Sequence, residues 1–304
     1  DMKDRLISNR IAKVSYPTGF VHKTHLIRDH WYLEDTNIAK KDCYADDFGY
    51  QWNELAGNYT TYGNIHLSQL ARIGIKVSEI QNSRVLDAGS GSGRLSDLLK
   101  AFGADVMSLD YSEALLKYAL RESSPRSTLL RASIESIPVK SQTFDVVICW
   151  GVLHHVQDPA KALKELIRTT RIGGSIYIWV YADTAWMRRR QFICEYLGRL
   201  STSEMDSYSS FLAEQSVFLS SNERSHLAKR LSKALCFTVK SDPIQTKGVL
   251  FDGLGPTWHH LLYKEWFLKQ LLKIQRTSPF RVSSKFITGN GLVASLTRHA
   301  DFSD

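Results

Sequence analysis

The chain has 304 residues, of which 43% are hydrophobic and 23% are charged, a composition that is typical of a globular protein and excludes a disordered chain. No apolar run approaches the roughly 20 residues that cross a bilayer, and the first residues lack a signal-peptide pattern, so we expect a cytoplasmic protein. The formal net charge of +8 favours an acidic partner, but the basic residues are dispersed and exclude no substrate class.

The four cysteines lie far apart in the sequence, at Cys43, Cys149, Cys194 and Cys236. They form no CxxC pair, so they predict neither a zinc site nor a disulfide framework. The histidines and acidic residues also lack a spacing typical of metal ligands. The sequence therefore predicts no metal site.

The chain divides into four segments. Residues 1–46 mix aromatic and basic residues without a clear period, and predict an irregular N-terminal arm. Residues 47–182 contain apolar strand-like runs that alternate with helical patterns, which predicts a parallel sheet with right-handed crossovers. The predicted strands of this core lie at 83–89, 105–110, 127–133, 144–150 and 175–181.

The alternation stops after residue 182. Residues 183–250 are helix-prone and predict a helical cap on the substrate side. Residues 251–304 return to the core with a helix and two strands, "FRVSSKFI" and "GLVASLTRH". The glycines and asparagine of Gly289-Asn290-Gly291 join these strands and predict a closing β-hairpin.

The stretch "VLDAGSGSGRL", residues 85–95, places a glycine-rich turn between a strand and a helix. A dinucleotide fingerprint, GxGxxG, would need a glycine where the chain has Arg94, because a large side chain obstructs close helix–strand packing. Asp87 would also face the pyrophosphate. Both features disfavour NAD and FAD.

A ligand with an amino-acid end, a ribose and an adenine fits better. The carboxylate of Asp87 suits an ammonium group, and Asp110 lies at the expected distance along the sequence for both ribose hydroxyls. After the third strand, Ser133 and the Ile134 N–H can bond the adenine edge, while Tyr111 and Ile134 could sandwich its ring. This ligand is S-adenosylmethionine.

Five ordered motifs resemble those of class I S-adenosylmethionine-dependent methyltransferases, in particular the broad group that includes the quinone-biosynthesis enzymes. They are "VLDAGSGSGRL", "MSLDYS", "ASIESIPV", "FDVVICWGVLHHVQDP" and "RIGGSIYIWVY". The resemblance implies an α/β fold, a Rossmann-like seven-stranded sheet with an antiparallel last strand, to which we add the helical cap. Ser133 departs from the family, which often has Asp at that position. The predicted cofactor-binding residues are Asp87, Ala88, Gly89, Gly91, Asp110, Tyr111, Ser133, Ile134 and Cys149.

The sequence signals for the residues that bind the methyl acceptor are less specific than those for the cofactor. We predict the catalytic base among His259, His260 and His155, and substrate contacts from Tyr50, Trp150, His154 and Tyr263. For each of these residues, core packing or a backbone hydrogen bond is the alternative. The segment "FGYQWN" resembles the lead-in of methyltransferases that modify saccharides or secondary metabolites.

We therefore predict a biosynthetic enzyme that transfers the methyl group of S-adenosylmethionine to a small-molecule acceptor and leaves S-adenosylhomocysteine. A saccharide, a secondary metabolite, and an acidic or lipid-like molecule are the candidate acceptors. The alternatives are an RNA methyltransferase, which the basic charge favours, a catalytically silent cofactor-binding scaffold, and a nicotinamide oxidoreductase.

Overall fold

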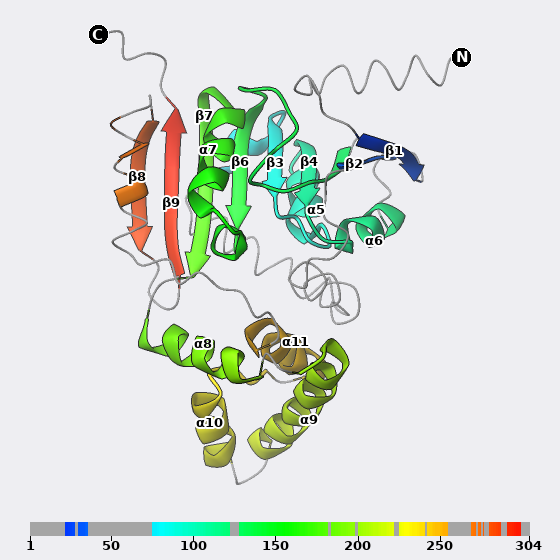
Figure 1. Ribbon diagram of the computed structural model, residues 1–304, viewed down its shortest axis with the longest axis vertical. Helices are drawn as coiled ribbons and strands as arrows, with labels where there is room; N and C mark the ends of the chain where they lie inside the picture. Colours follow the sequence, from blue (N-terminus) through cyan, green and yellow to red (C-terminus); the bar gives the residue numbers. More distant parts are fainter. Residues whose placement is uncertain are drawn as a thin grey trace.

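The computed structural model shows a sheet flanked by helices and a second group of helices beside it (Figure 1). The residues that it describes are 22–27, 30–35, 75–121, 128–181, 184–197, 200–221, 225–240, 242–254, 269–271, 273–274, 276, 280–286 and 291–298. Within these ranges, no helix is both long and apolar enough to span a membrane.

One sheet of nine strands runs through the described part of the chain, in the order β1-β2-β5-β4-β3-β6-β7-β9-β8. The strands are β1 (His22–Ile27), β2 (His30–Asp35), β3 (Arg84–Ala88), β4 (Asp105–Asp110), β5 (Thr128–Arg131), β6 (Phe144–Trp150), β7 (Thr170–Tyr181), β8 (Phe280–Phe286) and β9 (Gly291–Arg298). All neighbours from β2 to β7 pair in parallel, whereas β9 runs antiparallel to both β7 and β8. This confirms the predicted Rossmann-like sheet with a reversed last strand.

The prediction for the N-terminal arm was wrong for residues 22–35. Strands β1 and β2 pair antiparallel, and β2 pairs in parallel with β5, so they extend the expected seven strands to nine. The local sequence shows no strand period there. The pairing depends on the open edge of β5, which a local pattern does not reveal.

The central strands β3 to β7 carry buried residues on both faces, which explains why they are largely apolar. On β3, Val85 packs on one face with Leu99 of α5 (Arg94–Ala101), and Leu86 packs on the other face with Leu166 of α7 (Pro159–Thr169). Between residues 75 and 181, the described part of the core also contains the helical elements α4 (Val77–Ile80), α6 (Ala114–Arg121) and η2 (Leu153–His155). These layers hold the carboxyl ends of β3 to β7 in fixed positions.

In the described residues from 184 to 254, β7 is followed by the helices α8 (Ala185–Leu197), α9 (Thr202–Ser220), α10 (Ser225–Ala234) and α11 (Pro243–Leu254). They share their own hydrophobic cluster, which includes Leu212, Phe237 and Phe251. An ion pair of 2.7 Å between Lys247 and Asp206 joins α11 to α9. Figure 1 places this group beyond the carboxyl end of β7, the end from which α8 continues. The segment is helical, as predicted, and its role as a cap stays a prediction.

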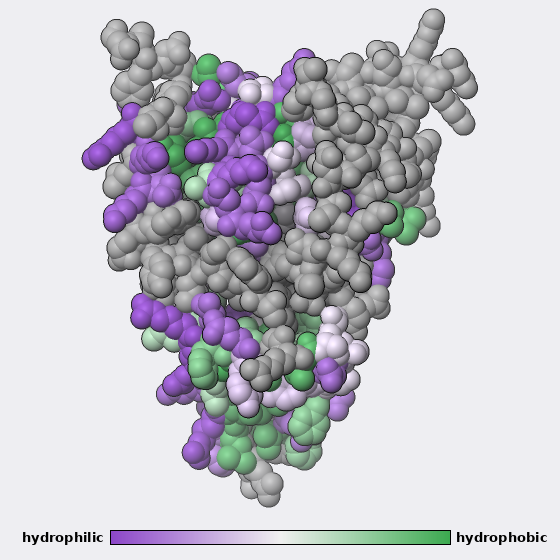
Figure 2. All heavy atoms as spheres, viewed as in Figure 1, coloured by the Kyte–Doolittle hydropathy of each residue, from purple (hydrophilic) through white to green (hydrophobic). Residues whose placement is uncertain are grey.

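The surface of this helical group is unusually apolar. Phe192 and Tyr196 on α8 are 71% and 77% exposed, and Phe211 and Phe218 on α9 are 59% and 62% exposed. In Figure 2, hydrophobic residues gather over these helices, whereas charged and polar residues dominate the described surface of the sheet half. The helical group therefore differs from the core in its surface as well as in its secondary structure.

The turn before α5 depends on Gly93. Its φ is +80°, and a Cβ at this position would overlap the ring of Tyr118, which is 1% exposed. Gly173 also has a positive φ, +77°, but a Cβ there meets nothing within 4 Å. The two glycines therefore share the backbone strain and differ in the steric clash.

We expect Gly93→Ala to destabilise the protein by about 1–3 kcal/mol more than Gly173→Ala, because overpacking adds to the cost of the left-handed backbone. Urea unfolding of the two variants measures this difference. Equal midpoints for the two variants would show that the packing against Tyr118 does not constrain the turn.

Candidate cofactor-binding site

The glycine-rich turn follows β3 and holds its backbone close to the neighbouring strand. The N–H groups of Gly89 and Ser90 donate to the carbonyl of Leu109 at 2.7 and 2.9 Å. Gly89 has a φ of +93°, and a Cβ there would overlap the side chain of Val152. Only glycine fits this position, because the Val152 side chain fills the space that a Cβ would occupy.

Asp87 is buried at the end of β3, with 2% of its surface exposed. Its Oδ2 accepts a hydrogen bond from the Ser96 hydroxyl at 2.6 Å, and Ser96 in turn accepts one from Ser108 at 2.7 Å. Burial raises the pKa of Asp87 to about 7; the Ser96 hydrogen bond lowers it and the charge of Asp110 raises it. Near neutral pH, this carboxyl group is therefore poised between its two protonation states.

The two serines were missed by the sequence analysis. Ser96 lies on α5 and Ser108 on β4, and both are fully buried. A polar residue within an apolar helix face or strand was the available signal. It does not say which partner the hydroxyl meets, because the two serines are 12 residues apart in the chain.

Asp110 joins the ends of β3 and β4. Its Oδ2 accepts the Gly91 N–H at 2.6 Å, and its Oδ1 accepts both the backbone N–H and the hydroxyl of Ser112, at 2.8 and 2.6 Å. A carboxylate offers about four acceptor positions. The backbone of Tyr111 also bonds this carboxylate, so a ligand hydroxyl has to share or replace one of the contacts that the protein makes.

Ser133 and Ile134 lie after β5, beside Asp110. Ser133 Oγ accepts the Glu135 N–H at 3.1 Å, and the Ala132 N–H donates to the Asp110 carbonyl at 3.1 Å. Ile134 is 4% exposed and belongs to the main core cluster. Its side chain thus packs chiefly against the protein, and the contact of these two residues with an adenine stays a prediction. Tyr111 follows Asp110, and its carbonyl accepts a hydrogen bond from Arg131 at 3.3 Å.

Cys149 and Trp150 end β6. Cys149 is fully buried in the core, and burial raises the pKa of its thiol to about 12. Its side chain is thus a neutral group packed in the core. The ring of Trp150 stacks on that of Trp179 from β7, with centroids 5.5 Å apart.

His154 and His155 lie in η2 beside the end of β7. Their ring centroids are 4.0 Å apart, and the His154 ring lies 4.5 Å from that of Tyr181. The Tyr181 N–H approaches His154 Nδ1 at 3.4 Å, and the Arg190 guanidinium from α8 lies 5.3 Å from the Tyr181 ring. We call the group that lines this edge the aromatic wall; its members are Trp150, His154, His155, Trp179 and Tyr181.

The structure thus brings most predicted residues to one edge of the sheet, at the carboxyl ends of β3 to β7. In an open α/β sheet, this is the edge at which ligands bind. Tyr50, His259, His260 and Tyr263 lie outside the described residues. Trp179 and Tyr181 were missed, because their positions in "IYIWVY" fit a buried strand equally well.

The site suits a ligand that carries a cation and hydroxyl groups. Two carboxylates, the buried Asp87 and the half-buried Asp110, flank the glycine turn. The hydroxyls of Ser90 and Ser92 are buried in the turn without a hydrogen-bond partner in the described part of the chain. Among the described residues, no group of three His, Cys, Asp or Glu could hold a metal ion.

Comparison with known proteins agrees with this geometry. Residues 86–178 match the family model described as "Methyltransferase domain". A ubiquinone biosynthesis O-methyltransferase of Albidiferax ferrireducens is 27% identical over 157 residues, which are 50% of this chain and 60% of that protein. A demethylmenaquinone methyltransferase of Renibacterium salmoninarum is 31% identical over 123 residues, 40% of this chain and 52% of that protein. The chain therefore spans less than two thirds of the length of these relatives.

Solved structures with a similar fold include the plantazolicin methyltransferase BpumL in complex with S-adenosylhomocysteine, with 13% identity and a TM-score of 0.48. That match covers 84% of this chain and 95% of BpumL. Magnesium protoporphyrin IX methyltransferase from Synechocystis, with bound S-adenosylhomocysteine, has 14% identity and a TM-score of 0.44; the match covers 86% of this chain and 89% of that one. Residues 86–178 thus match a methyltransferase domain, and the relatives that share sequence with this chain are methyltransferases.

Proposed function

We propose that the chain transfers the methyl group of S-adenosylmethionine to a small-molecule acceptor, which attacks that methyl group in line. The observation that carries this proposal is the pair of carboxylates, the buried Asp87 and the half-buried Asp110, on either side of a glycine turn. When bound, the cofactor supplies an electrophilic methyl group on a sulfonium. The task left to the protein is to hold two reactants in attack geometry, which can contribute about 7–11 kcal/mol.

Each part of the site has a role in that task. Asp87, oriented by Ser96, accepts the ammonium group of the cofactor. Asp110 accepts a ribose hydroxyl, while the Gly91 N–H keeps the carboxylate in place. Ser133 and the Ile134 N–H face the adenine. The helices α8 to α11 act as a cap that excludes water from the acceptor.

The aromatic wall supports an acceptor that carries a flat or apolar ring, since stacked rings such as Trp150 and Trp179 favour such a partner. The relatives named for ubiquinone and menaquinone biosynthesis agree with this choice. A secondary metabolite or a lipid-like ring compound thus suits the site better than a saccharide. His155 is the one candidate base among the described residues. With a hydroxyl acceptor, a histidine base contributes about 10²–10⁴-fold in rate.

A substitution at Asp110 tests the cofactor role. We expect Asp110→Asn to weaken S-adenosylhomocysteine binding at least about tenfold, because the amide replaces an acceptor oxygen and a charge-assisted hydrogen bond is lost. The same variant should also transfer less methyl group from tritiated S-adenosylmethionine to a panel of phenolic and quinol acceptors. The matched control is Asp105→Asn, at the exposed start of the same strand. Binding by Asp110→Asn that equals the control would contradict the proposal.

The pH dependence of binding tests the role of Asp87. The pKa of Asp87 is raised to about 7, so the carboxylate that attracts the ammonium group forms as the pH rises through 7. Between pH 6 and pH 8, the ionised fraction rises about tenfold, and we expect binding of S-adenosylhomocysteine to strengthen by up to that factor. Calorimetric titration across this range measures the effect. Asp87→Asn should remove this rise, and an unchanged pH profile in that variant would contradict the assignment.

The same group should destabilise the ligand-free protein at high pH. The pKa of this carboxyl group is higher in the folded protein than its unfolded value of 3.8. The folded protein therefore loses stability as the pH rises from about 4 to about 7. We therefore expect Asp87→Asn to melt at a higher temperature than the parent protein at pH 8, by at least about 2 °C. The difference should disappear near pH 4. A lower melting temperature for the variant at pH 8 would contradict the account.

A further inference from the structure

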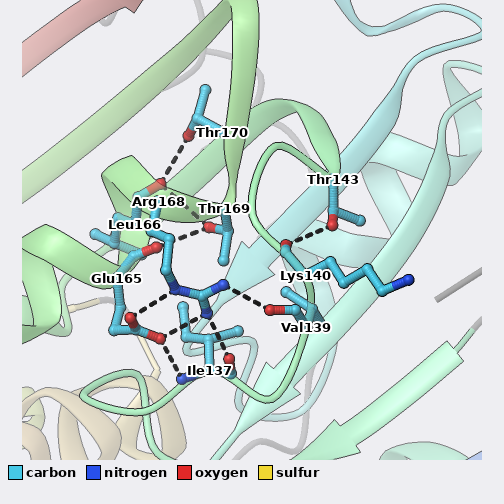
Figure 3. Close-up of polar contacts among 9 residues, drawn as sticks. All are labelled: Ile137, Val139, Lys140, Thr143, Glu165, Leu166, Arg168, Thr169 and Thr170. Carbon is cyan, nitrogen blue, oxygen red and sulfur yellow. Dashed lines mark hydrogen bonds and ion pairs between the residues drawn. The ribbon is translucent and has the colours of Figure 1, made fainter. Parts of the chain in front are cut away.

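The loop between β5 and β6, residues 132–143, is bonded along its length to α7, a helix that contributes none of the predicted cofactor contacts (Figure 3). The guanidinium of Arg168 donates from Nη1 to the carbonyl of Val139 at 2.6 Å and from Nη2 to that of Ile137 at 2.7 Å. One side chain thus binds two loop carbonyls in the fixed geometry of a planar fork.

Glu165 holds that fork and reaches the loop itself. Its Oε1 and Oε2 accept from Arg168 Nε and Nη2, both at 2.7 Å. Oε2 also accepts the Ile137 N–H at 2.8 Å. The pair lies three residues apart on α7, with side-chain exposures of 20% for Glu165 and 28% for Arg168. It therefore binds both the N–H and the carbonyl of Ile137.

The ends of the loop are attached to the same helix. Glu135 accepts the Asp158 N–H at 2.5 Å, just before α7 begins, and the Glu135 N–H bonds Ser133 Oγ at 3.1 Å. At the other end, the Gln142 N–H donates to the carbonyl of Arg168 at 2.8 Å. The position of Ser133 thus follows from the position of α7, through Glu135 and through the pair at Ile137.

We propose that Glu165 and Arg168 are positioning residues that hold the loop in the conformation in which Ser133 and Ile134 bind the adenine of the cofactor. This inference rests on the proposed function, because it assigns the adenine to that loop. Loops lose order easily when their backbone hydrogen bonds are left to water. Without the Arg168 fork, the loop has to be ordered by the ligand, which lowers the apparent affinity.

The decisive variant is Arg168→Lys, which keeps the charge but cannot bond both carbonyls and Glu165 in one plane. We expect its dissociation constant for S-adenosylhomocysteine to rise about tenfold, the effect of losing one or two charge-assisted hydrogen bonds. In methyl-transfer assays, KM for S-adenosylmethionine should rise by a similar factor while kcat at saturating cofactor stays within about twofold. Glu165→Gln, which can still accept the Ile137 N–H, should give a smaller loss of affinity.

Arg171→Lys is the matched control. Arg171 lies three residues further along, at the start of β7, and pairs with Asp145 instead of the loop. Its substitution should leave the dissociation constant unchanged. Calorimetry separates positioning from folding, because partial misfolding lowers the number of binding sites per chain, whereas a misplaced loop raises the dissociation constant at full stoichiometry.

The possible outcomes separate the two proposals. If the parent protein binds no S-adenosylhomocysteine, the proposed function fails and this inference fails with it. If the parent binds and Arg168→Lys binds equally well, or loses only binding sites, the positioning role is overturned while the proposed function stands. If Arg168→Lys does not fold, Glu165→Gln decides alone, and an affinity equal to that of Arg171→Lys overturns the inference.

Discussion

The hydrogen bond from the Gly91 N–H to the Asp110 carboxylate, 2.6 Å long, is the contact on which the site depends. It joins the turn after β3 to the end of β4, two strands that are adjacent in the sheet. The overlap that excludes a side chain at Gly89 and the packing of Tyr118 at Gly93 fix the rest of that turn. A carboxylate that orders a glycine turn is held in place before the cofactor binds, which lowers the entropy cost of binding.

The helix α7 gives the site a second fixed element. Its first residues follow η2, which carries His154 and His155 of the aromatic wall, and Asp158 accepts the Lys161 N–H to cap the helix. Its last turns bind the loop that follows β5, the strand that pairs with β4 and its last residue, Asp110. The aromatic wall and the loop that carries Ser133 therefore share one rigid support. The helical group after β7 approaches the same edge through Arg190, which lies over Tyr181.

The sequence predicts the parts of this molecule whose signal is local. Strands β3 to β7 are short apolar runs with buried residues on both faces. A glycine turn and carboxylates at strand ends indicate a ligand site in any parallel sheet. Ser96, Ser108 and the pairing of β2 with β5 depend on residues that are distant in sequence. Glu165 and Arg168 have the spacing of an ordinary helix-surface ion pair. Nothing in that spacing says that both side chains reach across to the backbone of Ile137.

The most direct test of the central claim is a calorimetric titration of the purified chain with S-adenosylhomocysteine, in parallel with NADH. The account predicts one S-adenosylhomocysteine site per chain, with a dissociation constant on the order of 1 μM, and no binding of NADH, because Arg94 stands where a dinucleotide site needs glycine. Binding of NADH in preference to S-adenosylhomocysteine, or no binding of the latter by folded protein, would contradict it.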